Sequence, residues 1–487
     1  MRPILMALGP AVAAFWALAA GLASAEEAAP YPPAEREVYV APHGTPEAKG
    51  TKESPVDFET AFTDGRITRP GTLVWVTGGR YEVGLLKQGK EVRGTPDKPV
   101  VFRAVPGQRA TVVGSLWILC DHTWLWGLEI TWPGGSGSGV EVRGGDGIHL
   151  VNNVIHDIGP TAEPAEPKYR VQGISGWNVG DGHAYYGNII YHAEWSHGIY
   201  TQNTADHSVK RIEDNIIFEN AGCGIHAYGE SLPLSGFHLE GNACFATSVI
   251  PDHAARYSRG QMNILLGGKK PISNLLVKEN YTWHPQPDAK RSVDIGYTAN
   301  GNADIRVIGN CFTGGARALE LKGVRQAVVR ENVLWATREP VRVTYAPGAL
   351  RPDVVFRNNW FIDNNRFDLP AWREQTGAGP SNRLVPGRDG RPGGVKAFVR
   401  VNRYNRRRVH IIAYNWDHRP AISVDLGDAL ARGDAFRVVN VVDYFGKPVL
   451  EGEARGPRIV LPMRGHRHEP EFGVYVLTIE SPDDAAR

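Results

Sequence analysis

The chain has 487 residues, enough for one large elongated domain and a smaller second domain. Its 56 Gly and 34 Pro suit many short strands joined by turns. With 54 basic and 52 acidic residues the formal net charge is only +2, so the charge gives no basis for nucleic acid as a partner.

Residues 1–25 have the pattern of a secretory signal peptide. Arg2 is the only charged residue there, positions 4–22 are almost wholly apolar, and Ala23-Ser24-Ala25 is a small-x-small cleavage site. We therefore expect a secreted or periplasmic protein. No other stretch is apolar enough to span a membrane, so we expect no membrane span after signal cleavage, and a monomer.

The mature chain begins with a predicted strand at 37–41. Ser54-Pro55, followed by Val56, Phe58, Ala61 and Phe62, then predicts a short amphipathic helix with Ser54 as its N-cap. Further strands are predicted at 73–76, 100–102 and 111–113. We expect the helix to cover the open end of a stack of strands.

An Asn recurs along the middle of the chain, each time just ahead of a short apolar pair. The eight positions are Asn153, Asn188, Asn215, Asn242, Asn280, Asn310, Asn332 and Asn359. Their spacings of 22 to 38 residues fit one rung of about 22 residues with loop insertions. Short runs between them carry apolar residues at alternate positions, which is the period of a strand. The repeat predicts an all-β solenoid, a parallel β-helix, with each Asn in left-handed conformation at a tight bend and hydrogen-bonded along the stack.

The pattern stops after Asn359. Residues 366–394 are rich in Gly, Pro, Arg and Asn and predict a linker or a long wrapping loop. From 395 to 480 strands return without the Asn, which predicts a small C-terminal β-sandwich. Its expected strands lie at 397–401, 409–414, 422–426, 436–442, 459–461 and 474–479.

The four Cys do not form an evident disulfide framework. Cys244 and Cys311 follow Asn markers two rungs apart, which is too far for a bond. Cys120 lies in an apolar run, and Cys223 could at most approach Cys244. We expect mainly buried thiols, with one bridge left open, and no Cys/His spacing predicts a zinc site.

Motifs near the N-terminus carry a family resemblance. They are Val38-Tyr39-Val40-Ala41-Pro42-His43-Gly44, Pro70-Gly71-Thr72, Gly78-Gly79-Arg80-Tyr81, Gly94-Thr95-Pro96-Asp97-Lys98-Pro99-Val100 and Pro106-Gly107. Together they resemble the first rungs of secreted right-handed parallel β-helix proteins of the pectate-lyase-like superfamily, over residues 36–365. The resemblance implies a right-handed β-helix with substrate bound along the groove of one sheet. Because members include polysaccharide lyases, glycoside hydrolases and epimerases, it leaves the reaction open. The Asp-Pro-His-Glu motif of alginate epimerases and the paired Asp motifs of polygalacturonases are not found in the sequence.

One strand of each rung is proposed to form that groove. If the first and third residues of this strand point inward, the second and fourth point outward. The first outward column is Glu141, Ser175, Tyr200, His226, Leu265, Asp294, Glu320 and Arg342. The companion column is Arg143, Trp177, Gln202, Tyr228, Gly267, Gly296, Lys322 and Thr344. Aromatic faces suit sugar rings and polar groups suit hydroxyls, so we assign substrate binding to Glu141, Arg143, Trp177, Gln202, Tyr228 and Lys322.

Long insertions at 158–172, 245–262 and 283–291 are expected beside this face. They carry Lys168, Arg170, His253, Arg256, Arg259, His284, Lys290 and Arg291. This cationic bias favours a polysaccharide or oligosaccharide with acidic sugars as the partner.

Two catalytic mechanisms compete, with a non-catalytic glycan-binding or structural role as the third alternative. In β-elimination, His226 would abstract a proton from a uronic acid while Tyr200 on the neighbouring rung protonates the leaving oxygen. In retaining hydrolysis, Asp294 and Glu320 on neighbouring rungs would serve as nucleophile and acid/base. The cationic loops and the Tyr–His adjacency favour elimination. No cofactor is evident, and Ca²⁺ is the one metal left open.

Overall fold

The computed structural model describes residues 33–161, 171–248, 262–285 and 291–480. The predicted signal peptide lies outside the described residues. The described chain is nearly all β, and its strands pair in parallel over most of its length. It is a right-handed parallel β-helix followed by a small antiparallel part, as predicted. In the described part of the chain, no helix is long and apolar enough to cross a membrane.

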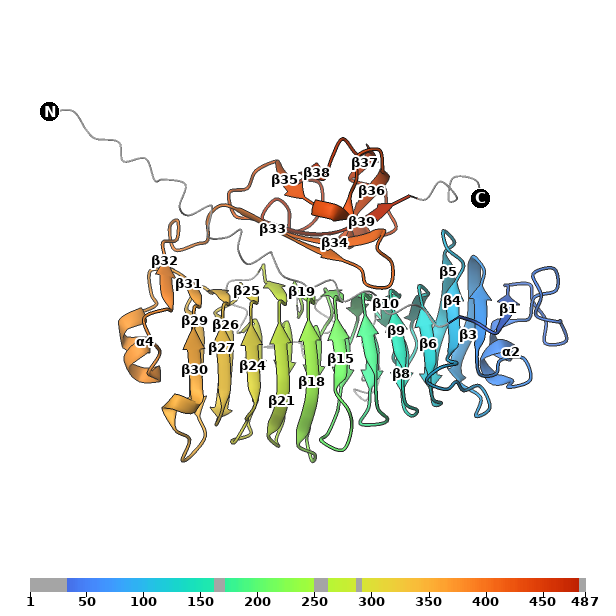
Figure 1. The fold of residues 1–487 in the computed structure, drawn as a ribbon, viewed down its shortest axis with the longest axis horizontal. Coiled ribbons are helices and arrows are strands. Elements are labelled where there is room, and N and C mark those ends of the chain that lie inside the picture. The colour runs from blue at the N-terminus through green and yellow to red at the C-terminus, as the bar shows by residue number, and fades with distance from the viewer. Residues whose placement is uncertain (1–32, 162–170, 249–261, 286–290, 481–487) are drawn as a thin grey trace. The chain divides into compact units, whose positions relative to one another are not determined.

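Three parallel ladders build the β-helix, and their strands stand side by side in chain order (Figure 1). The first ladder contains β1 (Arg36–Val40), β2 (Thr72–Val76), β4 (Val100–Ala104), β6 (Thr123–Trp126), β9 (His149–Val151), β12 (Ala184–Tyr186), β15 (Lys210–Glu213), β18 (Leu234–Glu240), β21 (Ile272–Lys278), β24 (Ile305–Ile308), β27 (Ala327–Arg330) and β30 (Val354–Arg357). The second ladder, after the Asn markers, contains β7 (Glu129–Pro133), β10 (Val154–Gly159), β13 (Ile189–Ala193), β16 (Ile216–Phe218), β19 (Ala243–Phe245), β22 (Tyr281–Trp283), β25 (Cys311–Thr313), β28 (Val333–Trp335), β31 (Trp360–Ile362) and β32 (Arg383–Val385).

The third ladder is the predicted groove. It contains β8 (Val140–Val142), β11 (Ile174–Gly176), β14 (Ile199–Thr201), β17 (Ile225–Ala227), β20 (Ile264–Leu266), β23 (Val293–Ile295), β26 (Arg317–Val324) and β29 (Glu339–Tyr345). Two longer strands, β3 (Gly79–Lys87) and β5 (Ala110–Ile118), pair with each other, and β5 continues into both β7 and β8. Inward-facing Ile, Val and Leu from all three ladders form one continuous core.

The Asn markers form the predicted stack at one bend. Each side-chain amide donates to the Oδ1 of the next Asn at 2.8–3.1 Å, from Asn153 through Asn359. The backbone conformation differs from the prediction in one respect. The left-handed residue is the one before each Asn, for example Asp214 at φ 54° and Glu279 at φ 51°, because this residue makes the bend and the Asn then turns its side chain into the stack.

Residues 366–394 are more regular than the expected linker. They contain the helix α4 (Leu369–Thr376) and β32, which pairs with β31. Asn359 also donates to Asn382 at 2.8 Å, so the stack has a ninth Asn and a further rung. The Gly- and Pro-rich composition and the inserted helix α4 concealed this rung in the sequence.

The N-terminal helix also differs in detail. It is α2 (Phe58–Thr63), and Asp57, not Ser54, is its N-cap, since the Asp57 carboxylate accepts from the Thr60 N–H at 2.7 Å. Its residues Phe58, Ala61 and Phe62 are buried, and Phe58 and Phe62 pack against Phe102, so the helix joins the core as expected.

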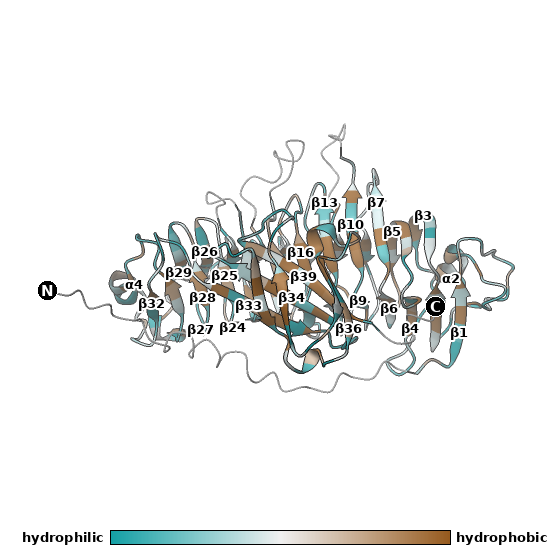
Figure 2. Cartoon of the chain, turned by 90° about the horizontal axis from the view of Figure 1, so that it is seen from above, coloured by the Kyte–Doolittle hydropathy of each residue, from teal (hydrophilic) through white to brown (hydrophobic). Residues whose placement is uncertain are grey.

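The C-terminal part contains the predicted antiparallel strands in two sheets with a shared core. One sheet has the order β33 (Val395–Val401), β34 (Arg408–Asn415), β39 (Phe472–Ile479), β36 (Ala435–Asn440) and β37 (Leu450–Glu453), and the other pairs β35 (Ala421–Asp425) with β38 (Arg458–Pro462). The described part of the chain also contains the short 3₁₀ turns η3 (Arg351–Asp353), η4 (Gly427–Ala429) and η5 (Val441–Asp443). Hydrophobic residues run along β34 and β39 (Figure 2).

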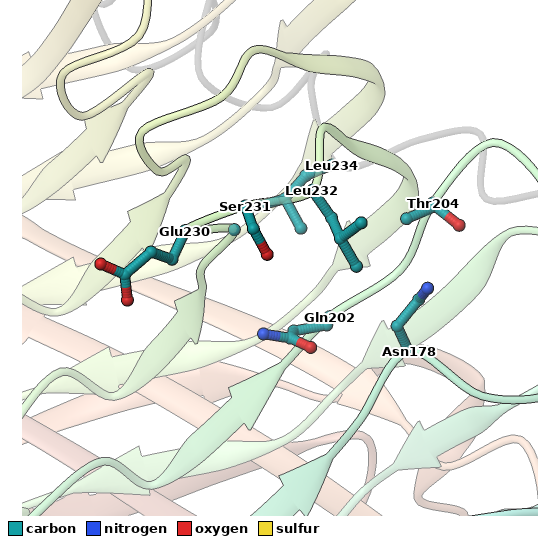
Figure 3. A pocket seen from close by; sticks show the side chains of 8 residues that line it. Asn178, Gln202, Thr204, Glu230, Ser231, Leu232 and Leu234 are labelled. Atoms are coloured by element: carbon teal, nitrogen blue, oxygen red, sulfur yellow. The ribbon is translucent and has the colours of Figure 1, made fainter.

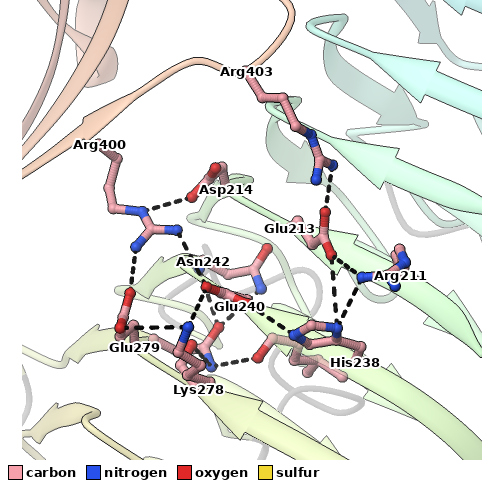
Figure 4. Close-up of polar contacts among 12 residues, drawn as sticks. Arg211, Glu213, Asp214, His238, Glu240, Asn242, Lys278, Glu279, Arg400 and Arg403 are labelled. Carbon is pink, nitrogen blue, oxygen red and sulfur yellow. Dashed lines mark hydrogen bonds and ion pairs between the residues drawn. The ribbon is translucent and has the colours of Figure 1, made fainter. Parts of the chain in front are cut away.

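Ion pairs and ring contacts join the C-terminal sheet to the solenoid. Arg400 bonds to Asp214 at 2.8 Å and to Glu279 at 2.6 Å, and Arg403 bonds to Glu213 (Figure 4). Arg400 and Arg403, both half-buried, thus anchor the C-terminal sheet to the solenoid.

All four Cys are free thiols. Cys223, Cys244 and Cys311 are buried and Cys120 is half-buried, so the bridge left open between Cys223 and Cys244 is not formed.

Candidate functional site

The third ladder has the predicted register. The pairs Glu141–Ser175, Ser175–Tyr200, Tyr200–His226, His226–Leu265, Leu265–Asp294, Asp294–Glu320 and Glu320–Arg342 are direct neighbours on consecutive strands. The flanking residues, such as Ile225 and Ala227, are fully buried in the core, so the outward column is a continuous line of side chains.

Aromatic rings and cations alternate at the N-terminal end of the groove. The Arg143 guanidinium lies 4.1 Å from the centre of the Trp117 ring and 5.6 Å from that of Trp177, and it also bonds to Glu141. Trp177 is one of the exposed large hydrophobic residues, at 37%. Trp117, which pairs with Glu141 in register, was missed in the sequence because the long strand β5 hides the rung boundary.

The middle of the groove gathers the predicted aromatic cluster. The Gln202 side chain donates to the Tyr200 hydroxyl at 2.9 Å and to the Tyr228 carbonyl at 3.1 Å. The His226 ring lies 5.7 Å from that of Tyr200 and 5.2 Å from that of Tyr228. The structure therefore brings these four residues together, half-buried, on adjacent rungs.

A second histidine, not predicted, fixes the proton of His226. The Cys223 backbone N–H donates to His197 Nδ1 at 2.9 Å, so the proton of a neutral His197 ring sits on Nε2. That Nε2 lies 2.8 Å from His226 Nδ1 and donates to it, which leaves the proton of a neutral His226 on its own Nε2. Neutral His226 therefore carries its proton on Nε2, which is buried, and the lone pair of its Nδ1 is already engaged by His197.

Among the residues that the structure describes, two clusters bring metal-ligand types close together, and neither has the all-oxygen ligand set that Ca²⁺ prefers. The first consists of His197, Cys223 and His226. Both nitrogens of His197 already make hydrogen bonds, one with the Cys223 N–H and one with His226, and burial raises the pKa of the Cys223 thiol to about 12. The second, of Asp157, His192 and Glu194, lies on the second ladder, where His192 bonds to Asp157 at 3.0 Å.

The C-terminal half of the groove is an ion-pair cluster around the two predicted carboxylates. Asp294 is fully buried and Glu320 is 4% exposed. One Nη1 atom of Arg291 bonds to both, at 2.8 Å from Asp294 Oδ2 and 3.1 Å from Glu320 Oε2. Lys322 adds a bond to Asp294 at 2.8 Å, and Arg317 adds one to Glu320 at 2.7 Å.

The two carboxylates have pKa values shifted in opposite directions. Burial raises the pKa of Asp294 in spite of the cations beside it, and its Oδ1 has no hydrogen-bond partner among the described residues. Burial opposes ionisation of Glu320 as well, but the charges of Arg317, Lys322 and Arg291 together hold its pKa below the ordinary value. The two neighbouring carboxyl groups thus differ in the direction of their pKa shifts.

A small hollow lies at the edge of the groove, next to the first ladder. It has a volume of about 80 Å³ (Figure 3). Its lining is Asn178, Gln202, Thr204, Gly229, Glu230, Ser231, Leu232 and Leu234. Of the predicted site residues only Gln202 lines it, because Tyr200, His226 and Tyr228 pack against one another along the groove floor. A larger, more open hollow at residues 64–70 and 91–95 contains no predicted site residue.

Of the predicted cationic loop residues, the structure describes two. Arg291 reaches the carboxylates, whereas His284 is buried and bonds to the Thr247 carbonyl. Lys168, Arg170, His253, Arg256, Arg259 and Lys290 lie outside the described residues.

The comparisons with known proteins find similar solved structures at low sequence identity. No protein-family model and no curated protein matches the chain. Among solved structures, the pectate lyase Pel9A is similar over 73% of this chain and 79% of its own, at 14% identity and a TM-score of 0.47. XylC, in complex with xylose, is similar over 91% of this chain and 100% of its own, at 11% identity and a TM-score of 0.44. A mannuronic acid specific polysaccharide family 6 lyase from human gut microbiota is similar over 73% of this chain and 92% of its own, at 13% identity and a TM-score of 0.40. The reaction therefore has to be argued from the side chains of the groove.

Proposed function

We propose that this chain is an exported carbohydrate-active enzyme that binds a glycan along the third ladder and hydrolyses it with retention at Asp294 and Glu320. This choice reverses the preference for elimination drawn from the sequence. The observation that carries it is the pair of register-matched carboxylates with opposite pKa shifts.

The separation of the two carboxylates supports retention. Because one Arg291 nitrogen bonds to both, their bonded oxygens lie no farther apart than the sum of 2.8 and 3.1 Å. Retaining glycosidases use a separation of about 5–5.5 Å, whereas inverting enzymes need roughly 6.5–9.5 Å to admit a water.

The directions of the pKa shifts support one division of roles, with Glu320 as nucleophile and Asp294 as acid/base. Ionised Glu320 attacks the anomeric carbon and forms a glycosyl ester, while the proton of Asp294 passes to the leaving glycosidic oxygen. In the second step the Asp294 carboxylate takes a proton from water, the water oxygen bonds to the anomeric carbon, and the ester bond to Glu320 breaks. The guanidinium of Arg317 keeps Glu320 ionised between turnovers.

The hydrogen bond from His197 to His226 weakens the case for the alternative, elimination at Tyr200 and His226. With His197 donating to its Nδ1 and its proton on the buried Nε2, neutral His226 has no free lone pair with which to abstract a proton. Elimination would need another base in the groove.

Product analysis on a panel of neutral and uronic acid glycans tests the proposal. Hydrolysis gives new reducing ends without the ultraviolet absorbance of an unsaturated uronide, and elimination gives both. Glu320→Ala with added azide should also yield a glycosyl azide, because azide replaces the missing nucleophile. Unsaturated products from the wild type would overturn the hydrolase proposal.

A further inference from the structure

Three polar residues occupy equivalent positions on successive rungs of the second ladder. Asp157 and His192 lie at matched positions of the paired strands β10 and β13 (Figure 2), and Glu219 follows the matched strand β16. Each has a left-handed backbone, at φ 51°, 52° and 47°. Such a backbone is uncommon for residues other than Gly, and strained positions of this kind cluster at ligand sites. The side chains form one line, with His192 Nδ1 3.0 Å from Asp157 Oδ1 and His192 Nε2 3.4 Å from Glu219 Oε2.

A second carboxylate joins Asp157 and His192 from the turn after β13. Glu194 is 9% exposed, and one of its oxygens lies within 4.8 Å of the ligand atoms of Asp157 and His192. Neighbouring ligand atoms on a Zn²⁺ ion, with bonds of about 2.1 Å, are roughly 3.0–3.4 Å apart. The 3.0 Å between His192 Nδ1 and Asp157 Oδ1 falls in this range. One nitrogen and two oxygens are therefore close enough to share one ion after small side-chain movements.

Hydrogen bonds already orient the remaining polar atoms of Asp157 and His192. Asp157 Oδ2 accepts from His156 at 2.9 Å, and His192 Nε2 is turned to Glu219. Glu219 is held in turn by His468 at 2.8 Å and by Arg467 at 3.1 Å, both from the C-terminal part. A metal-bound imidazole usually donates its other N–H to a carboxylate, and a ligating carboxylate is itself hydrogen-bonded. The groups that orient metal ligands are thus in place around this pair.

We propose that Asp157, His192 and Glu194 bind a divalent transition-metal ion such as Zn²⁺, which links two rungs of the solenoid beside the C-terminal part. One imidazole and two carboxylates suit Zn²⁺ better than Ca²⁺, which prefers oxygen ligands alone. The ion takes the place of the proton on His192 Nδ1, while Nε2 keeps its proton and its bond to Glu219. The side chains of Asp157 and His192 are 48% and 38% exposed, so water can complete the coordination.

The site goes beyond the proposed function, because no step of the hydrolysis uses these three residues. In the metal-free protein a proton competes with the ion. Burial disfavours a charged His192, but the hydrogen bonds to Asp157 and Glu219 outweigh it and raise the pKa of His192 to about 9. Binding at pH 8 should therefore release close to one proton for each ion bound.

Calorimetric titration with ZnCl₂ tests the site on the full chain without a histidine tag, after dialysis against EDTA and then metal-free buffer. At pH 8 we expect one ion per chain with a Kd in the micromolar range, and two buffers of different ionisation enthalpy give the number of protons released. Co²⁺ in place of Zn²⁺ should give a visible spectrum of nitrogen and oxygen ligands, without the sulfur-to-metal band expected for binding at Cys223. Binding weaker than millimolar, or a sulfur-to-metal band for the one bound ion, would overturn the proposal.

Two variants locate the ion. Asp157→Asn and His192→Asn each remove one ligand, and Asn tolerates the left-handed backbone. Each should weaken Zn²⁺ binding by at least about tenfold. If one of them does not fold, as judged by circular dichroism, the other keeps the test open. Unchanged affinity in the folded variants would place the ion elsewhere and overturn the proposal.

His238→Asn is the matched control. His238 is also a half-buried ring beside carboxylates, 2.9 Å from Glu240 and 3.8 Å from Glu213, but it lies on the first ladder, outside the proposed site. It should keep the affinity of the wild type, and an equal loss in this variant would mean that Zn²⁺ binds to surface histidines in general. Zn²⁺ binding without hydrolysis of any glycan would contradict the proposed function and leave the metal site standing.

Discussion

The two halves of the groove present different chemistry on the same backbone. The N-terminal half and the middle expose rings and neutral donors, with Trp177, Tyr200 and Tyr228 half-buried or exposed. The C-terminal half buries Asp294 and Glu320 beneath cations. The rings offer flat faces to a sugar, whereas the two carboxylates have shifted pKa values. Under the proposed function, the first half of the groove binds the glycan and the second half cleaves it.

The largest effect is expected from Glu320→Gln, which removes the nucleophile and keeps the shape. We expect kcat to fall by at least about a thousandfold, with KM little changed. Steady-state kinetics measures both constants. Glu339→Gln is the matched control, since Glu339 also bonds to Arg317, at 2.9 Å, but is half-buried at the rim, and it should stay within about threefold of the wild type. Equal losses of kcat in the two variants would contradict the role of Glu320 as the nucleophile.

The next largest effect is expected in the dependence of kcat/KM on pH. On the acid side, kcat/KM should fall as Glu320 gains a proton, and the midpoint of this limb should lie below the ordinary pKa of a Glu. On the alkaline side, kcat/KM should fall as Asp294 loses its proton, and the midpoint of this limb should lie above the ordinary pKa of an Asp. Each limb should approach about tenfold per pH unit. Asp294→Asn should abolish the alkaline limb. A profile without an alkaline limb in the wild type would remove Asp294 as the acid.

A smaller effect is expected from Trp177→Ala in the binding half. Loss of one exposed ring should raise KM by about tenfold and leave kcat within a factor of about two, because the ring contacts substrate and transition state alike. Trp75→Ala on the first ladder is the control outside the groove. A large fall in kcat with unchanged KM would contradict the division of the groove into a binding half and a catalytic half.

The smallest effect is expected from His226→Gln, which replaces one N–H donor by another. Its KM should rise by about threefold, the loss expected for one imperfect hydrogen bond. Independently, ¹⁵N NMR of the wild type at neutral pH should show His226 protonated at Nε2 and not at Nδ1. A proton on Nδ1, or a large fall in kcat, would restore His226 as a candidate base.

The solenoid and its register could be predicted because they are periodic. The Asn markers repeat, and the alternation of inward and outward residues follows from strand geometry, so Tyr200 and His226, or Asp294 and Glu320, fall on adjacent rungs. The ninth rung at Asn382 has the same marker, but its helix and turns obscured it.

The electrostatics of the site could be predicted only in part. His197 lies in a turn outside the strand period, so no pattern placed it against His226. Arg291 and Arg317 stand three residues before Asp294 and Glu320, a recurring offset that the sequence contains. The burial that separates the two pKa values depends on packing among rungs, which a linear pattern does not show.

Identification of the covalent intermediate tests the central claim most directly. The protein is incubated with a panel of activated 2-deoxy-2-fluoro glycosides, which form the glycosyl ester faster than they release it, and is then digested and analysed by mass spectrometry. We predict one added sugar on the peptide that contains Glu320, absent in Glu320→Gln and present in Glu339→Gln. A label on another residue, or turnover of the natural glycan to an unsaturated product without any label, would contradict the account.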